Sequence, residues 1–529
     1  MYRLFRAPRG LRGKLFKLTG PIFLETLLML TLGVVDTLML SHHSDNAVAA
    51  VGVVNQLLNM VFLLFNITTT GTSVMCALYF GAKDHKSFIQ VLGTSLLFNA
   101  GIGCLISLML FLFGREMLVL MDIRPDLMPD AATYMHIVGG FGFFQAVSFT
   151  ISAVLRAANK PNYAMQVTLL INVLNVFGNY ALIFGHFGFP ALGVQGAAIS
   201  TSVCRGVAMT LLFIMLFKRL VPRIPLAYFR PFPFQKLRDV LKIGLPSAAE
   251  QISYDASQVT IVYFINMLGN EYLTARVYVM NIVIIGYIFS LSIAQATSIC
   301  TGNLVGARKK QAAYLLSWYA WRRSLLITLV ASTGVYLLGR PLLGIFTENQ
   351  AIITIAMGAL LVDVLLEQGR ATVLLFLFCL RSVGDVVVPV IIELFCMWFF
   401  AVFCGYMFGI VFGLGLAGMW FAFALDECSR GAVLCLRWRT QKWKKRMLIK
   451  NKGLALFWEL DILAYKQFSP DVITLDITMP NMDGTEALKQ IKDYDEDEKG
   501  IVLCVFASRF RWDDVFLFRR QDRCEEVGR

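Results

Sequence analysis

The chain contains 529 residues, of which 57% are hydrophobic and 16% are charged, and its formal net charge is +13. Soluble domains are about half apolar and about a quarter charged. Together with a mean hydropathy of +0.65, this composition excludes an ordinary soluble domain and indicates a membrane protein.

Apolar runs recur along most of the chain, each long enough at ~1.5 Å per residue to cross the ~30 Å hydrocarbon core of a bilayer. No secretory signal is expected, because the basic segment 1–17 leads into a full-length span without a clear cleavage site. The fold class we predict is therefore an all-α polytopic membrane protein. Its twelve predicted transmembrane helices lie at residues 16–40, 47–80, 88–113, 128–155, 163–184, 192–217, 238–265, 272–304, 314–338, 350–379, 386–410 and 414–436.

The basic residues are unevenly distributed along this series. Lysine and arginine gather in residues 3–17, 218–242, 308–323 and 430–452, whereas loops such as 41–46 contain none. This is the positive-inside pattern, so we expect both ends of the membrane region in the cytoplasm and no role for nucleic acid. The eleven cysteines lack metal-ligand spacing, and we expect no bound metal.

Short segments recur at one constant offset. "LTGPIFLE" (18–25) aligns with "IGLPSAAE" (243–250) and "GREMLVLM" (114–121) with "GRPLLGIF" (339–346), and each pair is 225 residues apart. The offset predicts two six-helix repeats related by an axis along the membrane normal, with a cavity between them. The predicted domains are an N-terminal lobe (1–217), a basic cytoplasmic linker (218–237), a C-terminal lobe (238–446) and a separate tail (453–529).

Over residues 14–446 the chain resembles the multidrug and toxic compound extrusion (MATE) family. The resemblance is carried by segments such as "VVDTLMLSHHSDNAVAAVG", "IGLPSAAEQ" and "GLGLAGMWFAFALDECSRG". It implies two six-helix lobes around a V-shaped cavity, and export of amphipathic, often cationic, organic compounds in exchange for H⁺ or Na⁺. We accordingly expect a transporter and not an enzyme, monomeric, without a cofactor, in the bacterial cytoplasmic membrane.

Asp36 interrupts the apolar run "TLGVVDTLML" (31–40). A charge inside a span costs at least about 2.5–3.5 kcal/mol, and such residues are usually functional. The resemblance places Asp36 where the family keeps an acidic residue on its first helix. Glu25 precedes it by eleven positions, which puts both on nearly the same helix face. The alternative is a structural carboxylate that pairs with a neighbouring helix.

The fifth predicted span carries three amides at helical spacing, Asn172, Asn175 and Asn179. The family often has Asn at the position of Asn175, whereas some members carry Asp where this chain has Asn179. Thr201 on the sixth span matches a further polar position of the family. Ordinary hydrogen bonding between helices is the alternative. With Asp36 and Glu25, we assign Asn175, Asn179 and Thr201 to ion coupling, with H⁺ favoured over Na⁺.

The second half is more heavily charged. Asp363, Glu367 and Arg370 follow one face of the tenth predicted span, and Glu250 and Asp255 lie on the seventh. We assign these five residues to the substrate cavity, with Glu367 and Glu250 as the best candidates for binding a cation.

Buried ions of opposite sign usually pair, so structural ion pairs are the alternative interpretation of this charged group. Arg205 and Arg430 are repeat mates, and Glu427 precedes Arg430 by three residues. We predict that these three residues form structural ion pairs.

The tail has a different composition, and residues 461–507 resemble a truncated response-regulator receiver. In "PDVITLDITMPNMDGTEALKQIK" (470–492), residues 472–475 would be a buried strand and Asp476 the phospho-acceptor, followed by a helix, with the next strand at 500–507. A receiver needs an acidic pair to hold Mg²⁺, and this chain has the twelfth span where that pair should lie. We expect a fragment without signalling function, from a gene fusion or a sequence artefact.

Two other functions stay open from the residues alone. A lipid-linked-sugar flippase would use cavity arginines for phosphates, and a membrane sensor would signal through the tail. An ATP-driven pump is not indicated, because the chain contains no G-x-x-x-x-G-K-[ST] phosphate loop.

Overall fold

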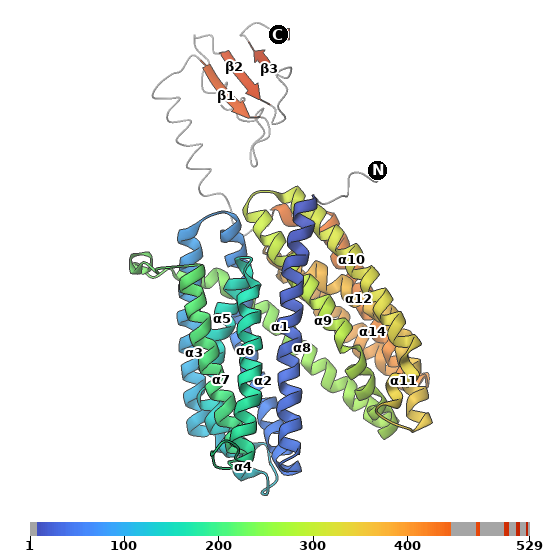
Figure 1. Cartoon of the computed structure of the whole chain (residues 1–529). Coiled ribbons are helices and arrows are strands. Elements are labelled where there is room, and N and C mark those ends of the chain that lie inside the picture. Colours follow the sequence, from blue (N-terminus) through green and yellow to red (C-terminus); the bar gives the residue numbers. More distant parts are fainter. Residues whose placement is uncertain (1–7, 446–471, 477–501, 507–514, 519–524, 527–529) are drawn as a thin grey trace. The chain divides into compact units, whose positions relative to one another are not determined.

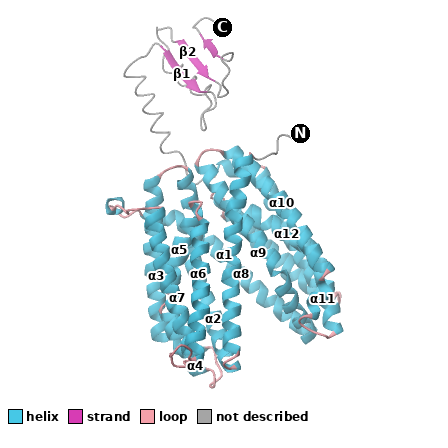
Figure 2. Cartoon of the chain, in the orientation of Figure 1, coloured by secondary structure: helices cyan, strands magenta, loops and turns pink. Residues whose placement is uncertain are grey.

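The computed structural model describes residues 8–445 and four short strands within residues 472–526 (Figure 1). The chain divides into two compact units, Met1–Leu448 and Ile449–Arg529. The described part of the first unit is helical, and the strands belong to the second (Figure 2).

The first half of the helical unit, here called the N-lobe, contains seven α-helices and one π-helical turn. In chain order they are α1 (Arg9–Ser41), α2 (Asp45–Gly81), α3 (His85–Leu120), α4 (Met128–Tyr134), η2 (Met135–Gly139), α5 (Phe143–Ala157), α6 (Pro161–Phe184) and α7 (Val194–Arg219). Its buried core gathers side chains of α1, α2, α3, α4, α6 and α7, among them Leu58 and Ile183.

The second half, here called the C-lobe, follows a linker that contains the short helix η3 (Leu226–Phe229). Its elements are α8 (Phe234–Leu268), α9 (Asn270–Gly306), α10 (Lys310–Leu337), α11 (Gly339–Gly344), α12 (Gln350–Ser382), α13 (Val387–Cys396), η4 (Met397–Cys404), η5 (Met407–Val411), α14 (Gly415–Arg439) and η6 (Lys442–Lys445). A separate core includes Trp420 and Leu360. α8 begins inside the predicted linker, which we had extended to residue 237.

Each predicted span is helical except for at most two residues at an end and one break at residues 141–142, and several helices extend beyond the predicted ends. By length and composition, eight helices of the described chain can cross a membrane, or nine if the bent pair Met128–Gly139 and Phe143–Ala157 is one span. The other three, α8, α10 and α14, each carry several charged residues. The chain is therefore a multi-pass helical membrane protein, and the count of twelve stays a prediction.

Large apolar side chains on the outside of the helices agree with a lipid environment. On α3, Leu105, Leu112 and Phe113 are each more than half exposed. Helices satisfy their own backbone hydrogen bonds, so they can present such faces to lipid.

The two lobes meet closely at one end of the unit, the end at which α1 begins. We call it the basic end and the opposite end the open end. A Cβ atom at Gly81 of α2 would lie 2.0 Å from the carbonyl oxygen of Asn303 on α9, and one at Gly306 would lie 2.0 Å from that of Leu78. Gly81 and Gly306 are repeat mates, as are Leu78 and Asn303. Small residues allow backbones to approach this closely.

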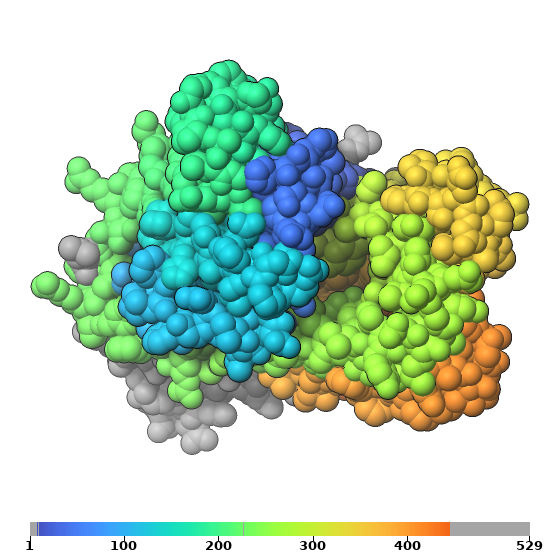
Figure 3. Space-filling view, turned by 90° about the horizontal axis from the view of Figure 1, so that it is seen from below, coloured from blue at the N-terminus to red at the C-terminus, as the bar shows by residue number. Residues whose placement is uncertain are grey.

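Polar contacts also join the lobes at the basic end. Lys236 Nζ, at the start of α8, donates to the Tyr79 hydroxyl at 2.7 Å and to Ser87 Oγ at 3.0 Å. Asn303 Nδ2 donates to Asn159 Oδ1 at 2.9 Å. Towards the open end the lobes diverge, and the view from that side shows a recess between the blue surface of the N-lobe and the yellow-green part of the C-lobe (Figure 3).

The second unit contains one described sheet in the order β1-β2-β3-β4. β1 (Val472–Asp476) pairs in parallel with β2 (Val502–Phe506), at the two places where strands were expected. β3 (Val515–Phe518) and β4 (Glu525–Glu526) continue the sheet antiparallel, so they do not extend a parallel receiver sheet. The predicted helix after Asp476 lies outside the described residues.

Candidate functional site

The polar group of the N-lobe centres on Asp36. Its Oδ1 accepts a hydrogen bond from Asn179 Nδ2 of α6 at 2.6 Å, and the same amide group donates to Asn175 Oδ1 at 3.1 Å. Asn175 and Asn179 are both 1% exposed. The amide spacing of i, i+4 places both on the face of α6 that contacts α1. Three of the predicted ion-coupling residues are thus in one hydrogen-bonded group.

Thr201 lies next to this group but has a different partner. Its side chain hydrogen-bonds Tyr134, which also hydrogen-bonds Asn55 of α2. Asn172, one helical turn from Asn175, donates to the backbone oxygen of Leu28 at 2.7 Å. Asn172 therefore joins α6 to α1 as a structural contact.

Arg205 does not form the ion pair that the sequence suggested, as far as the helical unit is described. Its guanidinium lies over the Phe62 ring at 5.1 Å and acts electrostatically on Asp36. Its Nη1 is buried and has no hydrogen-bond partner among the described residues. Arg205 therefore acts on Asp36 at long range and does not form an ion pair with it among the described residues.

Glu25 is separated from the Asp36 group. It is 2% exposed and pairs with Arg156 of α5, Oε1 to Nη1, at 2.6 Å. At ~1.5 Å per residue, eleven positions place it ~16 Å from Asp36 along α1. The shared helix face was predicted, but the carboxylate is engaged by a partner on another helix.

The C-lobe repeats this arrangement. Glu250 of α8 pairs with Arg381 of α12. Glu250 and Arg381 are the repeat mates of Glu25 and Arg156, and both pairs span 131 residues. The same ion pair therefore fixes the first helix of each lobe. Asp255, by contrast, is exposed and accepts a hydrogen bond from Gln251 at 3.1 Å.

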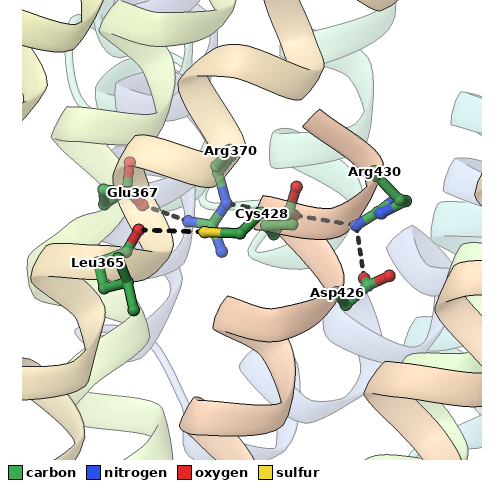
Figure 4. A network of polar contacts seen from close by, with 7 residues as sticks. Leu365, Glu367, Arg370, Asp426, Cys428 and Arg430 are labelled. Atoms are coloured by element: carbon green, nitrogen blue, oxygen red, sulfur yellow. Dashed lines mark hydrogen bonds and ion pairs between the residues drawn. The ribbon is translucent and has the colours of Figure 1, made fainter. Parts of the chain in front are cut away.

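The main charged cluster of the C-lobe joins α12 to α14 (Figure 4). Glu367 pairs with Arg370, whose Nε lies 3.8 Å from Glu427 Oε1. Glu427 also contacts Arg430 Nη2 at 3.1 Å, and the same nitrogen lies 2.7 Å from Asp426 Oδ2. The pairing of Glu427 with Arg430 was predicted, whereas Asp426 was missed.

Glu393 of α13 was also missed. It is 2% exposed and lies beside the carboxyl group of Glu250. The C-lobe thus concentrates more buried carboxyl groups than arginines near the point where α8, α12 and α14 meet.

One cavity brings two of the predicted substrate residues together. It has a volume of about 510 Å³ and is lined by Asp363 and Glu367 of α12, by apolar residues of α9 to α11, and by Phe23 of α1. Phe23 packs edge-on against Phe289 of α9, so α1 contributes to a cavity of the C-lobe. Glu367 Oε2 is buried without a hydrogen-bond partner among the described residues. An apolar cavity with a few buried polar groups is typical of a small-molecule site.

A helical membrane protein built from an internal repeat, with buried carboxylates and a recess between the two lobes, has the architecture of a secondary transporter. The family model MatE matches residues 21–181 and again 246–407. The chain belongs to the MatE family, whose members are transporters and not enzymes.

Comparison with individual proteins agrees with this family assignment. The chain is 38% identical to an uncharacterized transporter, YisQ, of Bacillus subtilis, over 81% of this chain and 94% of that protein. It is 26% identical to a probable multidrug resistance protein, NorM, of Thermotoga maritima, over 84% and 95%. Among solved structures, MATE in the bent conformation superposes with a TM-score of 0.76 at 21% identity, over 83% and 99%.

The two segments that match the family model begin 225 residues apart, which agrees with the predicted repeat. Neither segment reaches the tail, and the receiver resemblance of residues 461–507 stays a prediction. The missed arginines, Arg156 and Arg381, had a signal in the sequence. Both are charges inside apolar runs, and both recur at the repeat offset together with Glu25 and Glu250.

Proposed function

We propose that the protein is an antiporter that exports amphipathic, often cationic, organic compounds in exchange for H⁺ or Na⁺ by alternating access. The observation that carries the proposal is the Asp36 group, a carboxylate held by Asn179 at 2.6 Å within an otherwise apolar helix. The NorM relative, a probable multidrug resistance protein, supports the substrate class.

The positive-inside pattern supports a cytoplasmic location for the basic end. The helical unit is closed by contacts at the basic end and hollow at the open end. These contacts support our proposal that the arrangement is an outward-open state. The proposal includes twelve spans and places both ends of the membrane region in the cytoplasm. Inward opening would then require the Lys236 and Asn303 contacts between the lobes to break.

Asp36 is the proposed coupling residue. A carboxylate that binds H⁺ loses its charge, and one that binds Na⁺ has its charge compensated. In either case the hydrogen bond from Asn179 to Asp36 changes in strength. Moving one charge across the membrane is worth ~2.3 kcal/mol per 100 mV, and one pH unit adds ~1.4 kcal/mol. One ion per cycle could therefore maintain a gradient of a neutral compound of roughly a hundredfold or greater.

The cavity beside Asp363 and Glu367 is the proposed contact for the substrate. Its apolar lining fits the body of an amphipathic compound, and the unpartnered Glu367 Oε2 can accept a hydrogen bond from a cationic group. The transporter would act as a monomer in the bacterial cytoplasmic membrane and needs no cofactor.

The two alternatives receive less support. For a flippase, Arg205, Arg370 and Arg430 would have to bind phosphate. Arg370 and Arg430 are engaged by carboxylates. That leaves Arg205, whose guanidinium lies over the Phe62 ring, as a single cation. For a sensor, the tail would need a Mg²⁺ site that its sequence does not supply.

The test is dye efflux from everted vesicles with the pH gradient and the Na⁺ gradient imposed separately. We expect efflux by the parent protein under at least one gradient, and a loss of at least tenfold in Asp36→Asn, which corresponds to ~1.4 kcal/mol. Absence of ion-driven efflux by well-inserted parent protein, across a panel of cationic and neutral dyes, would exclude the proposed antiport.

A further inference from the structure

A second cavity lies on the outside of the C-lobe at the basic end. It is a groove of about 780 Å³ between the start of α8 and the start of α13. Val387, on the α13 side, is also the first residue of the candidate span Val387–Val411. The groove therefore lies where that span enters the bilayer, at the depth of lipid headgroups.

One face of α8 forms a wall of the groove. Phe234, Arg238, Lys242 and Leu245 follow one another at i, i+4, i+8 and i+11, which keeps them on one side of the helix. Phe234 is 71% exposed and Leu245 55%. Two exposed cationic side chains thus lie between exposed apolar ones on the side of α8 that lines the groove.

Exposed apolar side chains continue from the groove along both helices. Ile252 on α8 and Ile391 on α13 are 55% and 59% exposed. Ten residues separate Lys242 from Ile252, or ~15 Å along the helix, about half of the ~30 Å hydrocarbon core. The cationic pair and the apolar stripe below it together match one leaflet in length.

Pro246 adds a hydrogen-bond acceptor to the groove. It lies inside α8 and has no N–H, so the carbonyl of Lys242 lacks its usual helical partner. A hydroxyl group of a bound molecule could donate to this oxygen. The only acid beside the cationic pair among the groove's described neighbours on α8 is Asp239, 3.6 Å from Lys242 Nζ and held by Gln235 at 3.4 Å.

We propose that this groove is a binding site for an anionic phospholipid, with the phosphate on Arg238 and Lys242 and the acyl chains along Leu245 and Ile252. Charge complementarity selects an anionic headgroup over a zwitterionic one. The apolar stripe selects a lipid over a free phosphate. The site is separate from the carboxylate groups assigned to transport, and it rests on the membrane-spanning fold and not on the proposed antiport.

The test uses the purified full chain in neutral detergent with a photoactivatable phosphatidylglycerol, and with a phosphatidylcholine probe of the same acyl chains. Crosslinks are mapped to peptides. We expect phosphatidylglycerol to label residues 234–252 and 387–395 in preference to phosphatidylcholine. Each basic residue at an anionic headgroup contributes about fivefold in affinity, so Arg238→Gln/Lys242→Gln should weaken this labelling about 25-fold.

Two variants sharpen the test. Asp239→Asn removes the opposing charge and should raise labelling about fivefold. Arg308→Gln/Lys309→Gln makes the same charge change at exposed positions of the same end and should leave labelling of the groove unchanged. Equal labelling by both probes, or an equal loss in the two double variants, would overturn the proposal. Displacement of the lipid probe by millimolar inorganic phosphate alone would overturn the assignment to a lipid.

Discussion

The two lobes share a scaffold but differ in how they hold buried charge. Each has a proline inside its first helix and a Glu–Arg pair at the same repeat position. In the N-lobe the other acid of α1, Asp36, is held by an amide, whereas in the C-lobe carboxylates and arginines form a connected cluster across α12 and α14. The two halves of the repeat therefore share the Glu–Arg pair that joins two helices, but their other buried charged groups differ.

This difference has a functional consequence. A carboxylate held by one neutral amide can change its charge with little rearrangement, because no ion pair among the described residues breaks when it does. A carboxylate inside a cluster shares its counter-ions, so a change at one residue alters several others. We therefore expect single substitutions in the N-lobe to affect coupling and those in the C-lobe to affect stability as well.

The largest effect should follow from Asp36→Asn. The substitution keeps the shape but cannot titrate, so ion-driven efflux should fall at least about tenfold under both gradients, with insertion unchanged. Glu25→Gln, at the ion pair with Arg156, should give a milder defect. Vesicles with matched amounts of each variant give the comparison. Near-parental efflux by Asp36→Asn would make Asp36 a structural carboxylate.

Breaking the repeat-related ion pair should destabilise the protein by a different amount in each lobe. Removal of one partner of a buried pair costs about 3–5 kcal/mol. Arg381→Met should lower the unfolding temperature more than Arg156→Met, because Glu393 adjoins Glu250 in the C-lobe only. Thermal unfolding in detergent measures this, with Glu250→Gln/Arg381→Met expected to recover part of the loss. Equal losses in the two lobes would contradict the comparison.

A smaller effect is expected from the donor to Asp36. Asn179→Leu removes a hydrogen bond to a charged group, worth about 1.5–3 kcal/mol, and should reduce ion-driven efflux several-fold. Thr201→Val is a matched control, because Thr201 hydrogen-bonds Tyr134 and not Asp36. Efflux assays on both variants distinguish a residue that contacts Asp36 directly from one that only lies near it. An equal or larger defect in Thr201→Val would mean that Asn179 has no special relation to Asp36.

The smallest effect should come from the tail. Deletion of residues 453–529 should leave efflux at the parental level, because the helical unit ends before this segment and the receiver-like fragment lacks its metal site. Quantified insertion and dye efflux test this. A normally inserted truncation without transport would show that the tail contributes to function.

The helices and their order could be predicted from apolar length alone, and the repeat was evident from the constant offset. Asp36 and the amides at 175 and 179 could also be grouped, because helical spacing fixes which residues share a face. The partners that these residues contact on other helices could not be predicted from the sequence. Glu25 was predicted to share a polar stripe with Asp36, but its partner Arg156 lies on a helix whose rotation the sequence does not specify.

Charged clusters were the least predictable part. Asp426 and Glu427 are adjacent in sequence, and both contact Arg430 at i−4 and i−3, yet only Glu427 had been assigned. Glu393 was missed although it had the same signal as Asp36, because it too is a single acid in an apolar run, "VVPVIIELFCMW". Arg205 was assigned to an ion pair that the described residues do not form, since its nearest contact is an aromatic ring.

The close glycine contacts between α2 and α9 make the basic end a pivot for rotation of the two lobes. Gly81 and Gly306 each lie against a backbone carbonyl of the other helix, and neither has a side chain that would keep the two backbones apart. Both helices are 37 residues long, or ~55 Å at ~1.5 Å per residue, and the crossing lies at one extremity of each. A rotation of about 5° there carries the opposite ends through about 5 Å. Because the crossing lies at one end of two long helices, a small rotation at these glycines would produce a much larger displacement at the open end.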